Sequence, residues 1–410
     1  MSTASAHEAR VAIEALRAGT PNRAAIRLLG TSETAIATRF AEGLDRIWEA
    51  APPPGQIIAG GFGAGKSHLL GTLREQALAR GIVVSWVTVS KETPLSHTGL
   101  MFAAAMRNAN VPGTADDVAT AALNRIQRIP GAVQALELWT ATQEAAVAPM
   151  FGAVAHLLGR NLSPALIQGI EAFLCGGKPP SAGVRARLAE LGARGLFELT
   201  GMRAIQLDLQ RPRFMAQLLH AAGFKGWCVM IDEVELIGRY GPAQRASAYT
   251  QLARWLGLWE AMRIPGLYAV AAITDDFTEN VIDLRRDDEK LPDRLRGRAL
   301  PDHASVASAA MRAIRGAPLL KAPDDAELAR HAETLRDCYQ AAYGWPTPPA
   351  AAAPRQSTRS MRQHIRGWIT EWDMQRLFGC SSGIEISTMP TDYSEDSELS
   401  SPPEDSRTDG

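Results

Sequence analysis

Residues 60–67 read Gly60-Gly61-Phe62-Gly63-Ala64-Gly65-Lys66-Ser67, which is the complete pattern G-x-x-x-x-G-K-S/T of a phosphate-binding (Walker A) loop. In such a loop, successive backbone N–H groups point into one concavity, and the following helix presents its positive N-terminal end to an anion. Glycines allow backbone angles that a Cβ would forbid. We expect a triphosphate to contact these residues and His68, with Lys66 on the β- and γ-phosphates and the Ser67 hydroxyl on Mg²⁺.

The flanks of this loop have the order strand, loop, helix that phosphate binding requires. The apolar run Gln56–Ala59 follows a Pro-Pro-Pro-Gly breaker and predicts a short buried strand. From residue 67 to 80, apolar residues recur at helical spacing and predict a helix directly after the loop. The alternative is a glycine-rich turn that binds nothing, and the context argues against it.

An acidic pair follows a later apolar run. Residues 226–231 read Gly-Trp-Cys-Val-Met-Ile and predict a buried strand that ends in Asp232 and Glu233. An acid at the carboxyl end of a parallel strand faces the ligand crevice, as in a Walker B motif. Asp232 is predicted to hold Mg²⁺, and Glu233 to orient and deprotonate the water that attacks the γ-phosphate. Glu235 is an alternative that would share this role.

The next apolar run, residues 266–273, predicts a further strand, and it ends in a polar residue, Thr274. We expect Thr274 to position the attacking water, with Asp275 as the second choice. The alternative is an ordinary turn or helix cap at the end of the strand.

Arginines near the leaving phosphate assist phosphoryl transfer. Arg294 is predicted to act as a finger that reaches the nucleotide of a neighbouring subunit. Arg359 is predicted to contact the nucleotide from the last helix, where Arg362 lies on the same face three residues on. Because the chain has 37 arginines, a solvated surface position is the alternative for each of them.

Alternating strands and helices favour an α/β fold, a P-loop NTPase with a mostly parallel sheet and helices on both faces. A short fifth strand is predicted at Arg298–Leu300. Roughly 125 residues separate the second strand (82–89) from the third, which predicts an inserted helical subdomain. The predicted division is an N-terminal helical segment (1–51), an ATPase core (52–97 and 225–303), a helical insertion (98–224), a C-terminal helical lobe (304–378) and an acidic disordered tail (379–410).

The formal net charge of −1 is unevenly distributed. Residues 381–410 hold eight acids and one arginine, so the other 380 residues carry a net charge of about +6. A tail rich in Ser, Pro, Asp and Glu is predicted to be solvated and disordered, with an interaction tail as the alternative.

The cysteines and the hydropathy of the chain indicate its cellular compartment. The four cysteines form no C-x-x-C pair, which argues against a zinc site or a disulfide framework. The N-terminus lacks the apolar stretch of a signal peptide, and no apolar run approaches the length that spans a bilayer. These features predict a cytoplasmic protein with no membrane partner.

With these motifs in place, the chain resembles the AAA+-type ATPases and, more narrowly, the ATP-binding proteins of bacteriophage-exclusion (BREX) defence systems. The resemblance covers roughly Ala9 to Phe378 and rests on residues 60–70, 89–95, 230–235 and 361–377. It implies ATP and Mg²⁺ as cofactors, hydrolysis of ATP, and other defence-system proteins as partners, with DNA and further copies of the chain as candidate partners.

Three function classes follow from the residues. The first is a hydrolase whose ATP cycle drives an assembly that works on or around DNA. The second is a nucleotide-dependent switch or scaffold with slow hydrolysis, and the third is a P-loop kinase. Intact Lys66, Asp232 and Glu233 favour turnover of ATP. The sequence has no zinc module and no basic stripe, so the N-terminal and C-terminal helices are the candidate DNA-binding surfaces.

Overall fold

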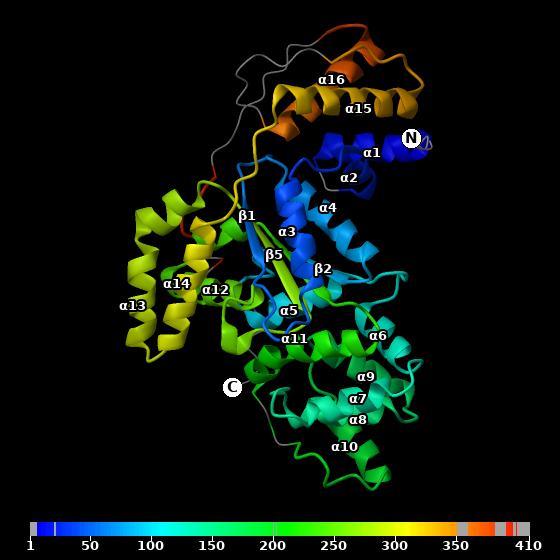
Figure 1. Cartoon of the computed structure of the whole chain (residues 1–410), viewed down its shortest axis with the longest axis vertical. Coiled ribbons are helices and arrows are strands. Elements are labelled where there is room, and N and C mark those ends of the chain that lie inside the picture. The colour runs from blue at the N-terminus through cyan, green and yellow to red at the C-terminus, as the bar shows by residue number, and fades with distance from the viewer. Residues whose placement is uncertain are drawn as a thin grey trace.

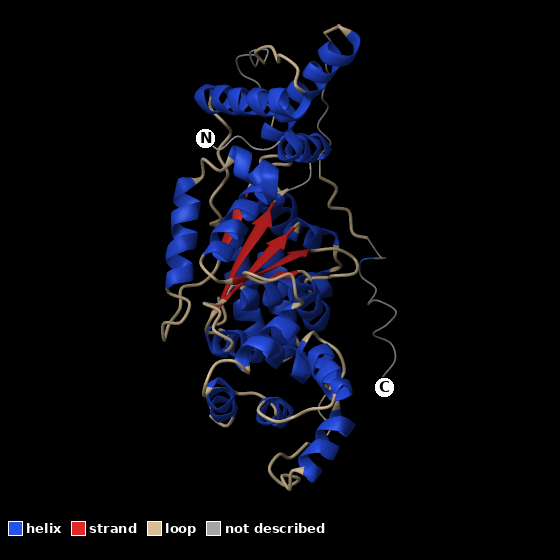
Figure 2. Cartoon of the chain, turned by 90° about the vertical axis from the view of Figure 1, so that its right-hand side faces the viewer, coloured by secondary structure: helices blue, strands red, loops and turns tan. Residues whose placement is uncertain are grey.

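A five-stranded sheet with the strand order β1-β5-β4-β2-β3 forms the centre of the protein (Figures 1 and 2). In the computed structural model, β1, β5, β4 and β2 pair in parallel, and β3 is antiparallel to β2. The strands are Gln56–Ala59 (β1), Val83–Thr88 (β2), Ala109–Asn110 (β3), Trp227–Asp232 (β4) and Leu267–Ile273 (β5). The structure describes residues 6–19, 22–199, 201, 203–350, 360–381, 391–396 and 399. The predicted mixed α/β class is confirmed.

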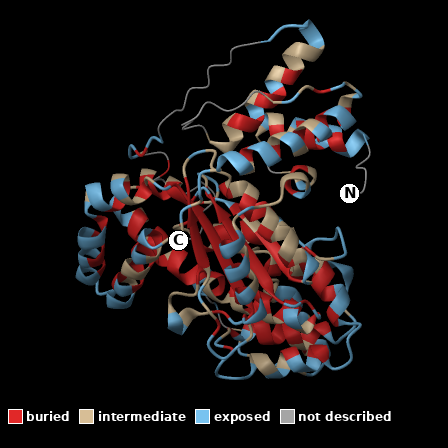
Figure 3. Ribbon diagram, turned by 45° about the horizontal axis from the view of Figure 1, so that its top comes forward, coloured by how far each residue is buried: buried red, intermediate tan, exposed pale blue. Residues whose placement is uncertain are grey.

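The two faces of the sheet build separate hydrophobic cores, because side chains alternate across a strand. Met230 points toward the face covered by α3 (Thr34–Asp45) and α4 (Lys66–Ala79). Val229 belongs to the larger core on the opposite face, which continues into the helical insertion. Every residue of β4 and β5 is buried, as expected for strands covered on both sides (Figure 3).

The predicted fifth strand at Arg298–Leu300 is wrong. Arg298 and Ala299 close the end of a helix, since their N–H groups donate to Leu295 O and Arg296 O. The edge beside β1 is instead formed by residues 318–320, which make a single parallel bridge between Leu319 and Ala59. No apolar run marks this bridge in the sequence, so its position depends on tertiary packing alone.

The segment between β2 and β4 is mostly helical, in line with the expected insertion. It also contains β3, which has only two residues and therefore no periodicity from which to predict it. Its helices are Thr98–Arg107 (α5), Val118–Ile126 (α6), Ala132–Thr140 (α7), Pro149–Leu158 (α8), Pro164–Leu174 (α9), Ser181–Glu190 (α10) and Ala204–Ala221 (α11). Within the part of the chain that the structure describes, no helix is long and apolar enough to cross a membrane.

Helices from the two ends of the chain pack into one lobe above the sheet (Figure 1). Helix α1 (Ala6–Ala18) lies against α15 (Asp325–Tyr343) and α16 (Met361–Phe378), and α2 (Arg23–Leu29) joins the same hydrophobic cluster. The three N-terminal helices are therefore divided between two parts of the structure: α1 and α2 belong to this end lobe, and α3 packs on the sheet.

Three helices after β4 pack against one another and contribute to the larger hydrophobic core. They are Pro242–Trp255 (α12), Asp287–Gly297 (α13) and Pro301–Arg315 (α14), and α14 contacts both of the others. Helix α12 ends at Trp255, and the chain turns at Gly257, which takes a left-handed φ of +67°. A 3-10 turn, Glu260–Met262, follows it.

Part of the acidic tail has a fixed place, although the sequence predicts disorder over 379–410. Residues 391–396 return to the core, where the Asp396 N–H donates to Arg239 O (2.9 Å). Tyr393 is 9% exposed and packs in an edge-to-face arrangement on Phe277. The disorder predicted from composition is wrong for residues 391–396, because one buried aromatic side chain and a few ion pairs are enough to hold a short segment on the core.

Candidate functional site

The predicted phosphate-binding loop (residues 60–67) lies between β1 and the start of α4. The Gly60 N–H donates to Ile273 O (3.1 Å), which ties the start of the loop to β5. Helix α4 begins at Lys66, and the Leu69 N–H donates to Gly65 O (2.8 Å) in its first turn. The first N–H groups of a helix have no partner within it, so this end of α4 is suited to receive an anion.

Two glycines of the loop have conformations that other residues avoid. Gly63 has a φ of +79° and Gly65 a φ of +104°, in the region that a Cβ disfavours. A Cβ on Gly63 would also lie 2.6 Å from the Ser360 Oγ at the start of α16. The loop therefore needs glycine both for its own path and for the approach of the end lobe.

Lys66 is buried at the base of the loop. Its Nζ donates to Gly60 O (2.7 Å) and to Gly61 O (3.3 Å), and lies 4.0 Å from the Glu235 Oε1. The ammonium is thus held inside the concavity of the loop, where a charged phosphate oxygen would meet it.

Ser67 and Asp232 meet at the end of β4. Burial raises the pKa of the Asp232 carboxyl, and the nearby Ser67 hydroxyl acts in the opposite direction. A hydroxyl beside a carboxylate is a donor set that suits Mg²⁺, which keeps several ligands from water and phosphate. Among the described residues there is no cluster of three or more His, Cys, Asp or Glu side chains fit for a metal. A magnesium ion here would therefore need oxygens from a nucleotide.

Glu233 has a strained backbone at the rim of the pocket. Its φ of +59° and ψ of +37° are left-handed, which is uncommon for a residue other than glycine and marks candidate functional positions. The side chain is exposed into the pocket, while Asp232 beside it is buried. Partial desolvation and the Asp232 charge both raise the pKa of the Glu233 carboxyl.

Glu235 lies deeper than Glu233, and the two carboxyl groups are close enough to affect each other's pKa. Burial raises the pKa of Glu235 to about 7, although the Lys66 ammonium acts in the opposite direction. Its Oε2 is buried and has no hydrogen-bond partner. Two neighbouring carboxyl groups with raised pKa values readily share one proton, so this pair can accept a proton near neutral pH.

Thr274 lies where β5 ends, next to the loop. It is buried, and its Oγ1 lies 2.5 Å from the hydroxyl of Tyr393 in the docked tail. The following residue, Asp275, faces the loop, since a Cβ on Gly61 would lie 3.5 Å from the Asp275 Oδ2. The parallel pairing of β1, β5 and β4 thus brings the ends of these strands to one edge.

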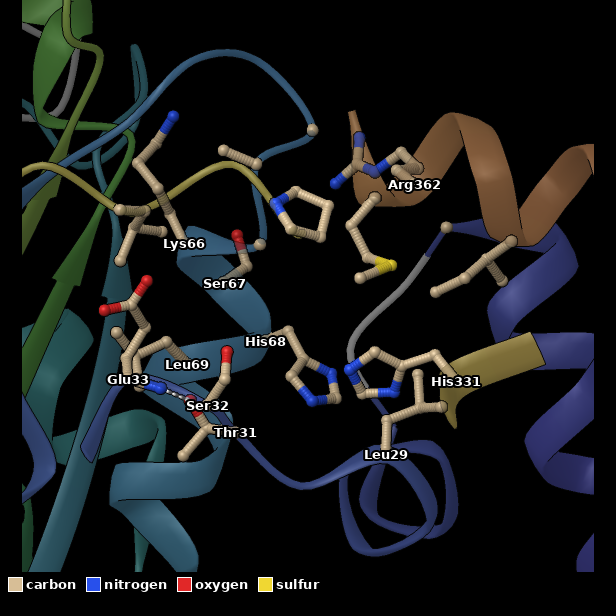
Figure 4. A pocket seen from close by; sticks show the side chains of 18 of the residues that line it. Leu29, Thr31, Ser32, Glu33, Lys66, Ser67, His68, Leu69, His331 and Arg362 are labelled. Atoms are coloured by element: carbon tan, nitrogen blue, oxygen red, sulfur yellow. Dashed lines mark hydrogen bonds between the residues drawn. The ribbon is translucent and has the colours of Figure 1, made fainter. Parts of the chain in front are cut away.

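Arg362 of α16 reaches the loop from the end lobe (Figure 4). Its guanidinium lies 5.3 Å from the centroid of the Phe62 ring, and its backbone N–H donates to Gly63 O (3.3 Å). Its charge also acts on the carboxyl groups of Asp232 and Glu233. It is therefore the arginine of α16 that approaches the predicted phosphate position.

The pocket continues past the loop into a space between the end lobe and the loop that precedes α3. His68 and His331 point toward each other across it (Figure 4), and burial lowers the pKa of both imidazoles. The neutral His68 ring donates from Nε2 to Gly30 O (2.7 Å), which braces that loop. The apolar side chains lining this part are Leu16, Leu29 and Ile365.

The other two predicted arginines do not lie in this pocket. Arg294 is exposed on α13, which Figure 1 shows beside the core and away from the end lobe. It is absent from the residues that line the pocket. Arg359 lies outside the described residues, directly before α16.

Some residues of the site could not be predicted from the sequence. Glu33 lies 27 positions before Gly60, His331 and Tyr393 lie more than 260 positions after Ser67, and no motif links any of them to the loop. The available signals are weak: the Asp324 cap marks the start of α15, and Tyr393 is an aromatic residue in an acidic tail.

The parallel sheet, the loop at its carboxyl edge and the acidic pair are compatible with a P-loop nucleotide-binding protein. The family model of the BREX system ATP-binding protein BrxC/D matches residues 4–129 and 209–369, which is more than half of the chain. The chain belongs to this family. The matched ranges leave out α7 to α10, the outer part of the helical insertion. Neither the curated proteins nor the solved structures contained a match to the chain.

Proposed function

We propose that this BREX ATP-binding protein is an AAA+-type ATPase that converts ATP and water to ADP and phosphate. Family membership supports ATP as its ligand. The position of Glu233 is the observation that supports hydrolysis: its side chain is exposed at the pocket, directly beside the buried Asp232–Ser67 pair. A kinase needs no such carboxylate for water, whereas an ATPase does.

The residues fit a nucleotide with its metal. When bound, Mg²⁺ would neutralise charge that develops on the phosphate oxygens. The Ser67 hydroxyl and the Asp232 carboxylate would hold it, and Lys66 would turn from Gly60 O to the β- and γ-phosphates. The base and ribose would extend toward His68, where the apolar side chains of the end lobe can cover a nucleobase.

Glu233 would remove a proton from the attacking water. A general base works best when its pKa is near the operating pH, and the raised pKa of this carboxyl suits that role. Glu235 would support Glu233 by sharing the proton that Glu233 accepts. Thr274 would orient the water from the end of β5.

Two features support the AAA+ type. Strand β5 lies between β1 with its loop and β4 with the acidic pair, so a polar strand end separates the two motifs. A helical lobe after the core places Arg362 at the loop. We propose that copies of the chain assemble so that the exposed Arg294 of one copy reaches the nucleotide of the next.

Other proteins of the BREX system and DNA are the partners that we propose, with the cytoplasm as the compartment. The end lobe is the candidate DNA surface, because it joins helices from both ends of the chain. A DNA mobility-shift assay at several salt concentrations, with and without ATP, tests this, since phosphate contacts weaken steeply with salt.

A nucleotide-dependent switch with slow hydrolysis is the second candidate. The closeness of Glu235 to Glu233 favours it, because a carboxyl group that interacts with its neighbour is less available to water. The two candidates differ in turnover rate and share the same ATP site.

Phosphate release measured without any acceptor substrate tests the proposal. We expect Lys66→Ala and Glu233→Gln both to abolish release, while Glu233→Gln retains ATP binding in isothermal titration calorimetry. Normal turnover by Glu233→Gln would contradict the catalytic assignment, and wild-type ATP binding with only slow release would support the switch.

A further inference from the structure

The docked tail places one hydroxyl group beside Thr274. Tyr393 OH lies 2.5 Å from Thr274 Oγ1 and donates to Asp276 Oδ1 (2.7 Å). A tyrosine hydroxyl has a single proton. Since that proton is directed to Asp276, the 2.5 Å contact requires the Thr274 hydroxyl to donate to the tyrosine oxygen. Thr274 Oγ1 can then only accept a hydrogen bond from a third group.

The ring of Tyr393 is held as firmly as its hydroxyl. It packs edge-to-face on Phe277, with ring centroids 5.9 Å apart, and lies against Gly238. A Cβ on Gly238 would lie 2.7 Å from the Tyr393 Cδ1, so this glycine makes room for the ring. Burial raises the pKa of Tyr393, and the negative charges of Asp276 and Glu235 act in the same direction. The hydroxyl therefore stays protonated, within electrostatic reach of Glu235.

Arginines of the core bind the acidic residues around Tyr393. Arg239 pairs with Asp396 (2.8 Å), and Arg245 pairs with Glu395 (2.8 Å). Arg285 donates to the backbone carbonyl of Tyr393. Gln244 Nε2 also donates to Leu399 O (2.9 Å). Charge complementarity and backbone hydrogen bonds thus fix the segment independently of the tyrosine hydroxyl.

We propose that Tyr393 is a positioning residue for ATP hydrolysis, and that the docked C-terminal segment completes the hydrolytic site by orienting the Thr274 hydroxyl. This inference rests on the proposed hydrolysis and on Thr274 as the residue that orients the water. With its own proton committed to Tyr393, the Thr274 oxygen accepts a hydrogen bond from the attacking water, while Glu233 removes the other proton of that water. The tail therefore promotes turnover and leaves ATP binding unaffected.

The test compares Tyr393→Phe with the wild-type protein at full length. The substitution removes one hydroxyl and keeps the ring on Phe277. We expect kcat for ATP hydrolysis to fall about tenfold, because one hydrogen bond in the reacting geometry is lost. KM for ATP and the calorimetric ATP affinity are expected to stay unchanged, which a general loss of structure would not allow. Tyr343→Phe is the matched control, since its hydroxyl bonds to Glu14 in the end lobe and its kcat should equal that of the wild type.

Hydrogen–deuterium exchange gives a second measurement that needs no turnover. In Tyr393→Phe, exchange is expected to rise at residues 274–277 and to stay low at residues 391–396, where the arginines still hold the segment. Equal or faster turnover by Tyr393→Phe, or a change in KM alone, would overturn the inference. If the wild-type protein releases no phosphate, the proposed function is wrong, and hydrogen–deuterium exchange then tests the inference by itself. A rise in exchange at residues 274–277 of Tyr393→Phe would support the positioning role, and no change would overturn it.

Discussion

The guanidinium of Arg362 lies 5.3 Å from the centroid of the Phe62 ring, so the C-terminal lobe touches the tip of the phosphate-binding loop. The two residues are 300 positions apart in the sequence. Phe62 is 69% exposed, which leaves its other face open to the pocket entrance. Through this contact, the loop and the end lobe can respond to the same ligand.

Replacing Arg362 with alanine should weaken ATP binding and slow hydrolysis. A guanidinium on an exposed ring contributes about 0.5–1 kcal/mol, and a contact with a phosphate oxygen of bound ATP would add a charge-assisted hydrogen bond. We expect Kd for ATP to rise about tenfold, measured by calorimetry. Arg366→Ala on the exposed side of the same helix is the control and should leave Kd unchanged. Equal effects of the two substitutions would show that Arg362 has no special role.

Gly63→Ala should abolish ATP binding while leaving most of the protein folded. The left-handed φ of +79° alone would cost about 1–2 kcal/mol with a Cβ, and that Cβ would also lie 2.6 Å from the Ser360 Oγ. Calorimetry with ATP and thermal unfolding measure the two effects separately. Gly297→Ala is a suitable control, because nothing lies within 4 Å of a Cβ there. ATP binding by Gly63→Ala with unchanged Kd would contradict this account of the loop.

The stability of the protein should depend on pH through Glu235. Its carboxyl group has a usual pKa of 4.5 and a pKa of about 7 in the folded protein. The folded state therefore binds more protons than the unfolded state between these values, so the free energy of unfolding falls as pH rises from about 4.5 to 7. At neutral pH, this difference in pKa lowers the free energy of unfolding by up to about 3 kcal/mol.

Glu235→Gln removes that charge and tests the sign. Urea unfolding should show that this variant is more stable than the wild type at pH 7.5 and no more stable at pH 5. Glu137→Gln, at the half-buried partner of His156, provides a comparison with little expected gain. A loss of stability in Glu235→Gln at pH 7.5 would show instead that the charged carboxylate is needed by Lys66.

Asp287→Ala should destabilise the bundle of α12 to α14 strongly. Its carboxylate accepts two hydrogen bonds from Arg245 (2.9 and 3.0 Å), and both side chains are almost completely buried. Removing one member of a buried pair costs about 3–5 kcal/mol, and the buried Arg245 would keep only the half-exposed Glu395 as its ionic partner. The neighbouring Asp288→Ala breaks an exposed pair with Arg315 and should cost less than about 1 kcal/mol. Thermal unfolding compares the two variants, and similar losses would refute the buried-pair argument.

The sequence predicted the central strands well, because they are buried along their length and so read as continuous apolar runs. The strands at residues 56–59 and 266–273 were predicted to within a residue. The false strand at Arg298–Leu300 and the missed β3 are both short, and such segments carry no periodicity. Pairing with a neighbouring strand decides them, and pairing is a tertiary property.

The loop over residues 60–67 and the acidic pair Asp232–Glu233 were readable from the sequence, because each depends on local geometry. Glycine allows the left-handed backbone, and a strand end places an acid at the edge of the sheet. Tertiary structure alone decided that Arg362 meets the loop, that Glu235 is buried beside Lys66, and that Tyr393 reaches Thr274. These contacts join segments that are distant along the chain, so their formation depends on which surfaces pack together, and no local pattern encodes that choice.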